Sequence, residues 1–214
     1  MEIILVRHGE TIWNREKRVQ GISNIGLSDF GRKQAQRLAE SLESVKISAI
    51  YSSPLKRAYQ TAAAIGKVHP VAIETEDDLQ ELDQGDFESL TLAELRENHA
   101  SFLEKWIADP AAVAIPNGES LNDLQRRAWD AFQKIIETCL RAPHSREGNK
   151  TLIVSHGFTI MTILCKIQGA ALNQFMQMHV DLASKTHVEI KDGKYSIMHF
   201  NDIKHLKGLS SIWL

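Results

Sequence analysis

The stretch Ile3-Ile4-Leu5-Val6-Arg7-His8-Gly9 places an apolar run directly before an arginine and a histidine. A second stretch of the same kind, Leu152-Ile153-Val154-Ser155-His156-Gly157, follows late in the chain. A short continuous apolar run is typical of a strand buried on both faces, as in a parallel sheet. We therefore expect two such strands, each followed by His-Gly, with both imidazoles at the same edge of one sheet.

Outward from these stretches, short β-type runs alternate with longer helical ones. Strands are expected at residues 2–6, 49–52, 71–75, 151–155, 188–190 and 195–200. Helices are expected at residues 28–44, 53–66 with Ser53-Pro54 as its start, 91 to about 107, from 120 onward, and 159–168. This alternation predicts an α/β protein, a three-layer α/β/α fold with a mostly parallel central sheet. Lys191-Asp192-Gly193-Lys194 is a typical hairpin turn, so an antiparallel edge strand is expected too.

Length and composition limit the organisation and the partners of the chain. With 214 residues, 43% hydrophobic and 24% charged, the chain suits a single domain, 1–214, with a helical insertion at about 90–118. The 25 Lys and Arg against 27 Asp and Glu give a net charge of −2, so neither nucleic acid nor a membrane is an expected partner. No run approaches the ~20 apolar residues of a membrane span. A strand begins within the first few residues, which leaves no room for a signal peptide, so a cytoplasmic protein is expected.

Polar side chains gather where three of the expected strands meet their helices. They are Arg7, His8 and Asn14 at the first junction, Ser53 and Arg57 at the second, and Ser155 and His156 at the third. In such folds ligands bind outside the carboxyl ends of the strands. Arginine forks and helix N-termini both suit phosphate oxygens. If the three strands are neighbours, the junctions together form a cationic site for a phosphate monoester.

Other phosphate chemistries find no support in the sequence. The chain contains no Gly-x4-Gly-Lys-Ser/Thr loop and no Gly-x-Gly-x-x-Gly. A Gly-x-Ser-x-Gly elbow is absent as well. None of the nine histidines lies three to five residues from another, so helical zinc spacing is missing. We expect no metal and no cofactor, and a mechanism in which histidine is the nucleophile.

The segment Leu5-Val6-Arg7-His8-Gly9-Glu10-Thr11-Ile12-Trp13-Asn14 resembles the signature of the histidine phosphatase superfamily, in its phosphoglycerate mutase-like branch. The resemblance continues at Tyr51-Ser52-Ser53-Pro54-Leu55-Lys56-Arg57 and at Asn117-Gly118-Glu119-Ser120. It ends with Val154-Ser155-His156-Gly157 and with residues 200–206, so it covers nearly the whole chain. The resemblance implies a phosphatase-type member of this family.

The resemblance also implies separate roles for the residues of the cationic site. His8 would attack phosphorus and become a phosphohistidine, while Arg7, Arg57, Asn14 and His156 would hold the phosphoryl oxygens. Phosphoryl transfer depends mainly on positioning and on stabilising charge at these oxygens, which suits two arginines and an imidazole.

Glu81 stands where the family keeps its proton donor, although Asp83 and Asp86 in the same acidic stretch are alternatives. A carboxylic acid at this place protonates the leaving alkoxide, which is typically worth ~10²–10⁴-fold in rate. Gln20 and Gly21 align with residues that contact substrate through the loop after the signature.

Departures from the family pattern concern the walls of the pocket. Phe158 follows His156-Gly157 where a small or polar residue is usual, and Ile22 replaces a common Trp. The region after Glu81 is short and fairly neutral, which favours water over a second phosphate as the acceptor. The favoured function is a metal-independent phosphomonoesterase acting on a small soluble phosphate ester. A phosphoglycerate mutase and a non-catalytic phosphate-binding relative are the alternatives, and both the substrate and a homodimer are left open.

Overall fold

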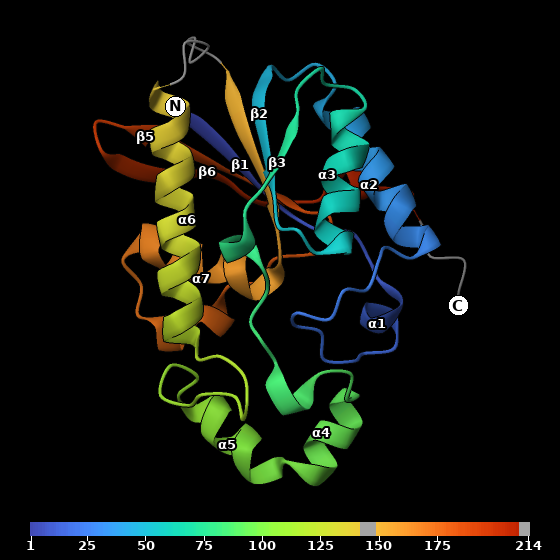
Figure 1. Cartoon of the computed structure of the whole chain (residues 1–214), viewed down its shortest axis with the longest axis vertical. Coiled ribbons are helices and arrows are strands. Elements are labelled where there is room, and N and C mark those ends of the chain that lie inside the picture. The colour runs from blue at the N-terminus through green and yellow to red at the C-terminus, as the bar shows by residue number, and fades with distance from the viewer. Residues whose placement is uncertain (142–148, 210–214) are drawn as a thin grey trace.

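The computed structural model describes residues 1–141 and 149–209 of the chain. Its centre is a six-stranded sheet with the order β3-β2-β4-β1-β5-β6 (Figure 1). The strands are β1 (Glu2–Arg7), β2 (Ile47–Ser52), β3 (Ile73–Thr75), β4 (Lys150–Ser155), β5 (Lys185–Lys191) and β6 (Lys194–Asp202). The strands β3, β2, β4 and β1 are mutually parallel, whereas β5 and β6 run antiparallel at one edge. The predicted α/β class is confirmed, and so is the hairpin at the edge, with β5 antiparallel to β1 and β6 antiparallel to β5.

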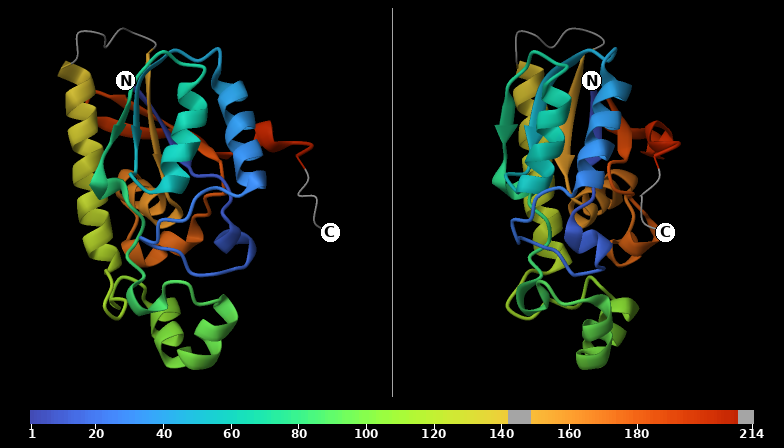
Figure 2. Two further views of the ribbon diagram at one scale, coloured as in Figure 1. Left: turned by 45° about the vertical axis from the view of Figure 1, so that its right-hand side comes forward. Right: turned by 90° about the vertical axis from the view of Figure 1, so that its right-hand side faces the viewer.

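Helices cover both faces of the sheet, which gives three layers (Figures 1 and 2). On one face lie α2 (Asp29–Leu42) and α3 (Lys56–Gly66), and on the other α6 (Leu121–Arg141) and α7 (Gly157–Gln168). In β1 the side chains alternate between the two layers, so that Ile4 and Val6 join the α2/α3 core while Ile3 and Leu5 join the other. All four are at most 1% exposed. This two-sided burial is the physical reason for the continuous apolar run.

The helix α2 forms where its sequence predicts it. The Ser28 hydroxyl accepts a hydrogen bond from the Gly31 N–H and so caps the first turn. Leu38 and Leu42 lie on the stripe that is buried against β1 and β2. Amphipathic spacing and capping thus agree with the tertiary structure at this helix.

The helix α3 starts later than predicted. Its N-cap is Leu55, and the helix begins at Lys56. The Ser53 hydroxyl accepts a hydrogen bond from the Leu55 N–H at 3.3 Å and lies 2.8 Å from His156 Nε2. The prediction of Ser53-Pro54 as N-cap and first helical residue is therefore wrong, since the Ser53 hydroxyl binds a backbone N–H that precedes the first helical residue, together with the His156 ring.

The predicted helix after Thr91 is interrupted at His99. Two helices form instead, α4 (Leu92–Asn98) and α5 (Ala100–Ala108). The backbone of His99 leaves the helical region with φ −133°, and its ring packs on Phe87 at a centroid distance of 4.8 Å. Both helices lie beyond the carboxyl ends of the parallel strands, below the sheet in Figure 1.

The remaining elements are short. They are α1 (Ile12–Arg15), η1 (Asp77–Leu79), η2 (Gly85–Phe87), η3 (Leu172–Gln177) and η4 (Lys204–Leu206). The β5–β6 hairpin turns through Asp192 and Gly193, both with positive φ (51° and 71°), as the Asp-Gly sequence predicts. No helix within residues 1–141 or 149–209 is long and apolar enough to cross a membrane.

Candidate active site

The three polar junctions meet at the carboxyl edge of the sheet. In the pairing register Arg7 lies beside Ser155, and Ser52 lies beside Val154, because β1 and β2 flank β4. The residues that follow the strands therefore converge. The rings of His8 and His156 lie 5.1 Å apart between centroids, and their residues are 3% and 0% exposed. The expected convergence of the two His-Gly stretches is confirmed by this register.

The hydrogen bonds of His8 fix its tautomer. Its Nδ1 lies 2.7 Å from the carbonyl oxygen of Gly9, which can only accept, so Nδ1 carries the proton and Nε2 keeps its lone pair. Burial, together with the charges of Arg57 and Arg7, holds the pKa of His8 well below 6.5. The imidazole is therefore neutral near pH 7 and can act as a nucleophile.

His156 is held in the opposite tautomer. Its Nδ1 accepts a hydrogen bond from Arg57 Nε at 3.2 Å, because a guanidinium can only donate. The proton then sits on Nε2 and is donated to the Ser53 hydroxyl. Burial, followed by the charge of Arg57, lowers the pKa of His156 well below 6.5. His156 is thus a neutral ring that is fixed by two neighbours.

Arg57 is fully buried and is held by the loop that follows the first junction. It donates to the carbonyl oxygens of Gly21 at 2.6 Å and Ser23 at 2.8 Å. With its amide oxygen turned to Arg57, Gln20 accepts from Nη1 at 2.9 Å and donates to the Thr11 hydroxyl at 2.7 Å. Burial lowers the pKa of Arg57 to about 10, so the group stays charged at neutral pH. Gln20 and Gly21 therefore contact Arg57 directly.

Gly21 also brings this loop against the segment that carries Glu81. A Cβ atom at position 21 would lie 2.3 Å from the carbonyl oxygen of Leu82 and 2.7 Å from the amide nitrogen of Gln84. Only glycine permits this approach of two backbones. The neighbouring Ile22 N–H donates to Glu88 Oε1 at 2.7 Å, which ties the two loops together a second time.

Arg7 presents an unused donor. Its Nη1 donates to the carbonyl oxygen of Val180, whereas its Nε is buried and has no hydrogen-bond partner in the described part of the chain. A Cβ atom on Gly157 would lie 3.3 Å from Nε, so this glycine leaves room for the guanidinium. A buried donor without a partner is rare and indicates a place for an acceptor supplied by a ligand.

Asn14 belongs to α1 and is oriented by a capping box. Its Oδ1 accepts from the Thr11 N–H at 3.0 Å, and its own N–H donates to the Thr11 hydroxyl at 3.1 Å. The same hydroxyl contacts Gln20. Within the described residues Nδ2 of Asn14 has no hydrogen-bond partner, so this donor is available to a ligand.

The side chain of Glu81 lies against the first turn of α7, the helix that begins directly after His156. Its Oε1 accepts from the N–H groups of Leu82 at 3.0 Å and Thr159 at 3.1 Å, and its Oε2 accepts from Phe158 at 3.1 Å. The residue is 7% exposed. The carboxylate is thus held by backbone donors, and its charge acts on both Arg7 and Arg57.

The two alternative acids have local partners instead. Asp83 Oδ1 accepts from the Gly85 N–H at 2.9 Å. Asp86 is exposed and binds the Asn117 amide. Glu10, a further carboxylate near the first junction, accepts hydrogen bonds from Arg15 and from the Ser28 hydroxyl. Of these carboxylates, Glu81 is the one that lies against the first turn of α7, next to His156.

Sequence reasoning placed Ser53 at the second junction but missed its contact with His156, and it missed Arg127 on α6 altogether. Arg127 pairs with Glu119 and with three backbone carbonyl groups near Glu81. For Arg127, the sequence feature that could have pointed to its role is its partner Glu119, which stands in the Asn117-Gly118-Glu119-Ser120 segment of the family resemblance.

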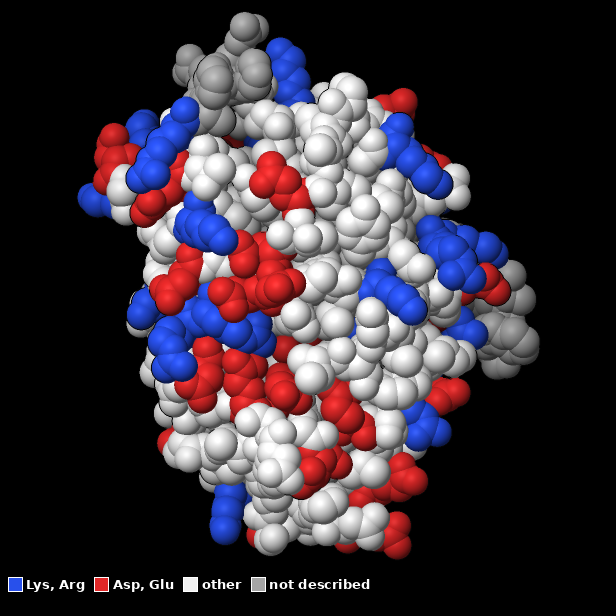
Figure 3. All heavy atoms as spheres, viewed as in Figure 1, with Lys and Arg blue, Asp and Glu red and all other residues white. Residues whose placement is uncertain are grey.

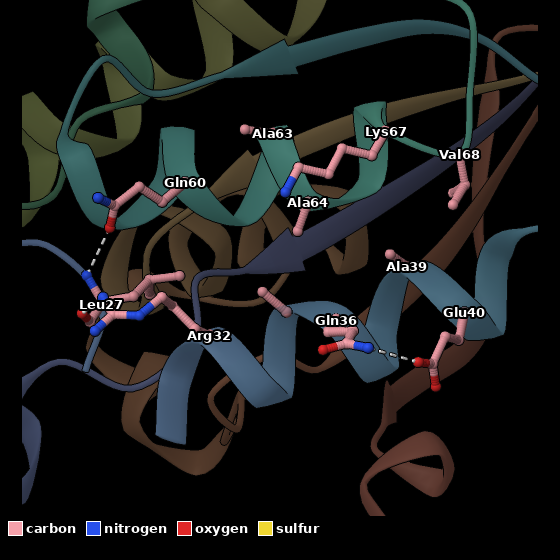
Figure 4. Close-up of a pocket in the computed structure, with 11 residues that line it drawn as sticks. Leu27, Arg32, Gln36, Ala39, Glu40, Gln60, Ala63, Ala64, Lys67 and Val68 are labelled. Carbon is pink, nitrogen blue, oxygen red and sulfur yellow. Dashed lines mark hydrogen bonds between the residues drawn. The ribbon is translucent and has the colours of Figure 1, made fainter. Parts of the chain in front are cut away.

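Lys and Arg side chains on the face in Figure 3 lie among acidic ones. Of the two arginines at the junctions, Arg57 is fully buried and Arg7 is partly exposed. A groove of about 690 Å³ between α2 and α3 is lined by Arg32, Gln60 and Lys67 among others, and by none of the site residues named above (Figure 4). Among the described residues no three His, Cys, Asp or Glu side chains form a metal-binding group.

The two neutral imidazoles make stability depend on pH. Their pKa values in the folded protein lie well below 6.5, so between those values and 6.5 the unfolded chain binds more protons. We expect the free energy of unfolding to fall as pH drops below about 6.5, by up to ~1.4 kcal/mol per pH unit for each imidazole. Urea unfolding across this range measures it. His8→Asn and His156→Asn should each flatten the dependence; an unchanged slope in both variants would refute the explanation.

Comparison with known proteins agrees with this geometry. Residues 3–203 match the model of the histidine phosphatase superfamily (branch 1). The fold and the paired histidines thus define a phosphatase-like α/β protein. The chain belongs to the histidine phosphatase superfamily.

Individual relatives cover nearly the full length of the chain. Phosphoserine phosphatase 1 of Hydrogenobacter thermophilus is 31% identical over 96% of this chain and 94% of its own. Phosphoglycerate mutase-like protein 4 of Arabidopsis thaliana is 34% identical over 96% of this chain and 87% of its own. The solved structure of Bacillus stearothermophilus YhfR superposes with a TM-score of 0.88 at 31% identity, covering 96% and 99% of the two chains.

Proposed function

We propose that the protein is a phosphomonoesterase that hydrolyses a small soluble phosphate ester through a phosphohistidine on His8. One observation carries the proposal: His8 Nδ1 is hydrogen-bonded to Gly9, which leaves Nε2 as a neutral nucleophile, and the adjacent Arg7 has a buried donor without a partner. A neutral imidazole beside unpaired positive charge suits attack on a dianionic phosphate.

The proposed reaction has two steps. His8 Nε2 forms a bond to phosphorus while the phosphorus–oxygen ester bond breaks, and Glu81 in its acid form gives a proton to the leaving oxygen. Water then attacks phosphorus, Glu81 takes a proton from that water, and the bond to Nε2 breaks to release phosphate. Each half-reaction leaves His8 and Glu81 ready for the next.

The charge that develops on the phosphoryl oxygens meets donors of the protein. Arg7 and Arg57 supply positive charge, while Asn14 Nδ2 and His156 add neutral polar groups at the same edge. Fixed donors of this kind are worth ~10²–10³-fold each when they act on the transition state. Because two arginines already supply the charge, we propose that the reaction needs no metal ion.

Hydrolysis is favoured over mutase chemistry by the charge of the acid loop. The chain has no Lys or Arg between Val68 and Leu95, the stretch that carries Glu81. A mutase would have to hold a second phosphate of its substrate near this loop. The relatives include proteins named for both activities, so an assay must separate them.

A panel of phosphomonoesters tests the proposal. Purified protein is expected to release phosphate from alkyl esters such as phosphoserine, with the same rate in excess chelator. Isomerisation of 3-phosphoglycerate is followed in parallel by NMR. Loss of phosphate release in chelator would contradict the metal-free reaction, and isomerisation faster than phosphate release would favour the mutase.

A further inference from the structure

Arg127 on α6 uses every N–H of its guanidinium. Its Nε and Nη2 donate to the two carboxylate oxygens of Glu119 at 2.7 and 2.8 Å. Its Nη1 donates to the carbonyl oxygens of Asp78 at 2.9 Å and Gln80 at 2.8 Å, and Nη2 donates again to that of Glu81 at 2.9 Å. All five donors are therefore paired.

Glu119 also binds the backbone that follows Glu81. We call the pair of Arg127 and Glu119 the clamp, because together they hold the backbone on both sides of Glu81. The backbone N–H of Glu119 donates to the carbonyl oxygen of Asp83 at 3.0 Å, two residues after Glu81. Gly118 permits this contact, because a Cβ there would lie 2.5 Å from the same oxygen. The Asn117-Gly118-Glu119-Ser120 segment thus has a structural purpose that the catalytic roles do not explain.

The clamp matters because no strand or α-helix carries Glu81. The residue lies between η1 and η2, in irregular backbone. Other contacts attach this backbone to β4 and α7: the Ser155 hydroxyl donates to Leu79 O at 2.7 Å, and the Thr159 hydroxyl donates to Gln80 O at 2.8 Å. Arg127 adds contacts from α6. The backbone around Glu81 is consequently held by β4, α7 and α6.

We propose that Arg127, oriented by Glu119, is a positioning residue that sets the distance between the Glu81 carboxyl and the leaving oxygen. This inference rests on the proposed role of Glu81 as general acid. Arg127 contacts the Glu119 carboxylate and three main-chain oxygens, and it has no hydrogen bond to the Glu81 side chain, His8 or His156. A bidentate Arg–carboxylate pair at 21% and 16% side-chain exposure has the directional geometry that such a task requires.

Leaving-group dependence separates positioning from general stability. An alkyl phosphate releases a strongly basic alkoxide and needs the proton of Glu81, whereas p-nitrophenyl phosphate releases a weakly basic phenolate and does not. The ratio kcat/KM reports the first phosphoryl transfer for both esters. A variant with less folded protein lowers both values equally, while a displaced acid lowers only the first.

The experiment compares Arg127→Lys and Glu119→Gln with Glu81→Gln. Both clamp variants are expected to lower kcat/KM for the alkyl ester about 10²-fold and for p-nitrophenyl phosphate less than about threefold. Adding Arg127→Lys to Glu81→Gln should cause no further loss on the alkyl ester. Arg126→Lys is the matched control, since Arg126 is the neighbouring residue, with an exposed ion pair to Asp123, and should leave both ratios unchanged.

The outcomes are distinguishable. Leaving-group dependence in Glu81→Gln but not in the clamp variants would overturn the positioning role alone. Equal losses on both esters in Glu81→Gln would overturn the general acid and the clamp with it. Glu119→Gln removes the bidentate partner that orients Arg127 but keeps the guanidinium, so it keeps the test open if Arg127→Lys does not fold.

Discussion

Replacing His8 by alanine is expected to abolish turnover, with a fall in kcat of at least about 10⁴-fold, because the neighbouring imidazole of His156 has both ring nitrogens engaged, by Arg57 and Ser53. In the native protein, alkaline quenching during turnover should trap phosphate on His8, which mass spectrometry of the digested protein detects. The alanine variant should carry no phosphate. Its secondary structure should be retained, since the backbone N–H of His8 still pairs with Ser155 O in β4.

His199→Ala is the control for this experiment. His199 is an exposed histidine of β6, far along the sheet from the β1–β4 pair. Full activity and native phosphorylation are expected for this variant. Turnover by His8→Ala at more than a few per cent of the native rate would show that the nucleophile is another group.

Replacing Arg57 by lysine is expected to lower kcat/KM by about 10²–10³-fold, although the positive charge is kept. An ammonium cannot reproduce the fork that reaches His156, Gly21 and Ser23 at once. The carbonyl groups left without donors should also lower the free energy of unfolding, by about 1–3 kcal/mol each. Phosphate-release kinetics and urea unfolding measure the two effects separately.

Arg37→Lys provides the comparison for Arg57→Lys. The Arg37 side chain is 53% exposed on α2 and its nearest carboxylate, Glu40, is 3.5 Å away. Both kcat/KM and stability should stay unchanged in this variant. An Arg57→Lys protein with native kcat/KM would mean that charge alone, and not the guanidinium geometry, serves the reaction.

The sheet and the convergence of the junctions could be predicted because their signals are local. The apolar runs of β1 and β4 reflect burial on both faces, and parallel strands end at a common edge. The Asp-Gly turn fixes the final hairpin in the same way. The role of His8 as nucleophile was implied by the resemblance of residues 5–14 to the family signature, and it stays a prediction.

The supporting contacts could not be predicted, because they join distant residues through groups with no sequence signal. Ser53 looks like a helix cap, yet its hydroxyl meets His156, 103 residues away. Arg127 binds main-chain carbonyl groups, which every residue possesses. The choice of Glu81 over Asp83 likewise depends on irregular backbone that neither periodicity nor propensity specifies.

The contacts of Arg57 with the carbonyl oxygens of Gly21 and Ser23 have a consequence for ligand choice. If Arg57 binds the phosphate as proposed, an incoming phosphate competes with these oxygens for the same guanidinium, so entry of the ligand is an exchange of acceptors. A doubly charged oxyanion attracts the guanidinium more strongly than a neutral carbonyl, whereas a phosphodiester with one charge gains less from the exchange. On this proposal the loop in its resting state competes with the ligand and so selects ligands by their charge.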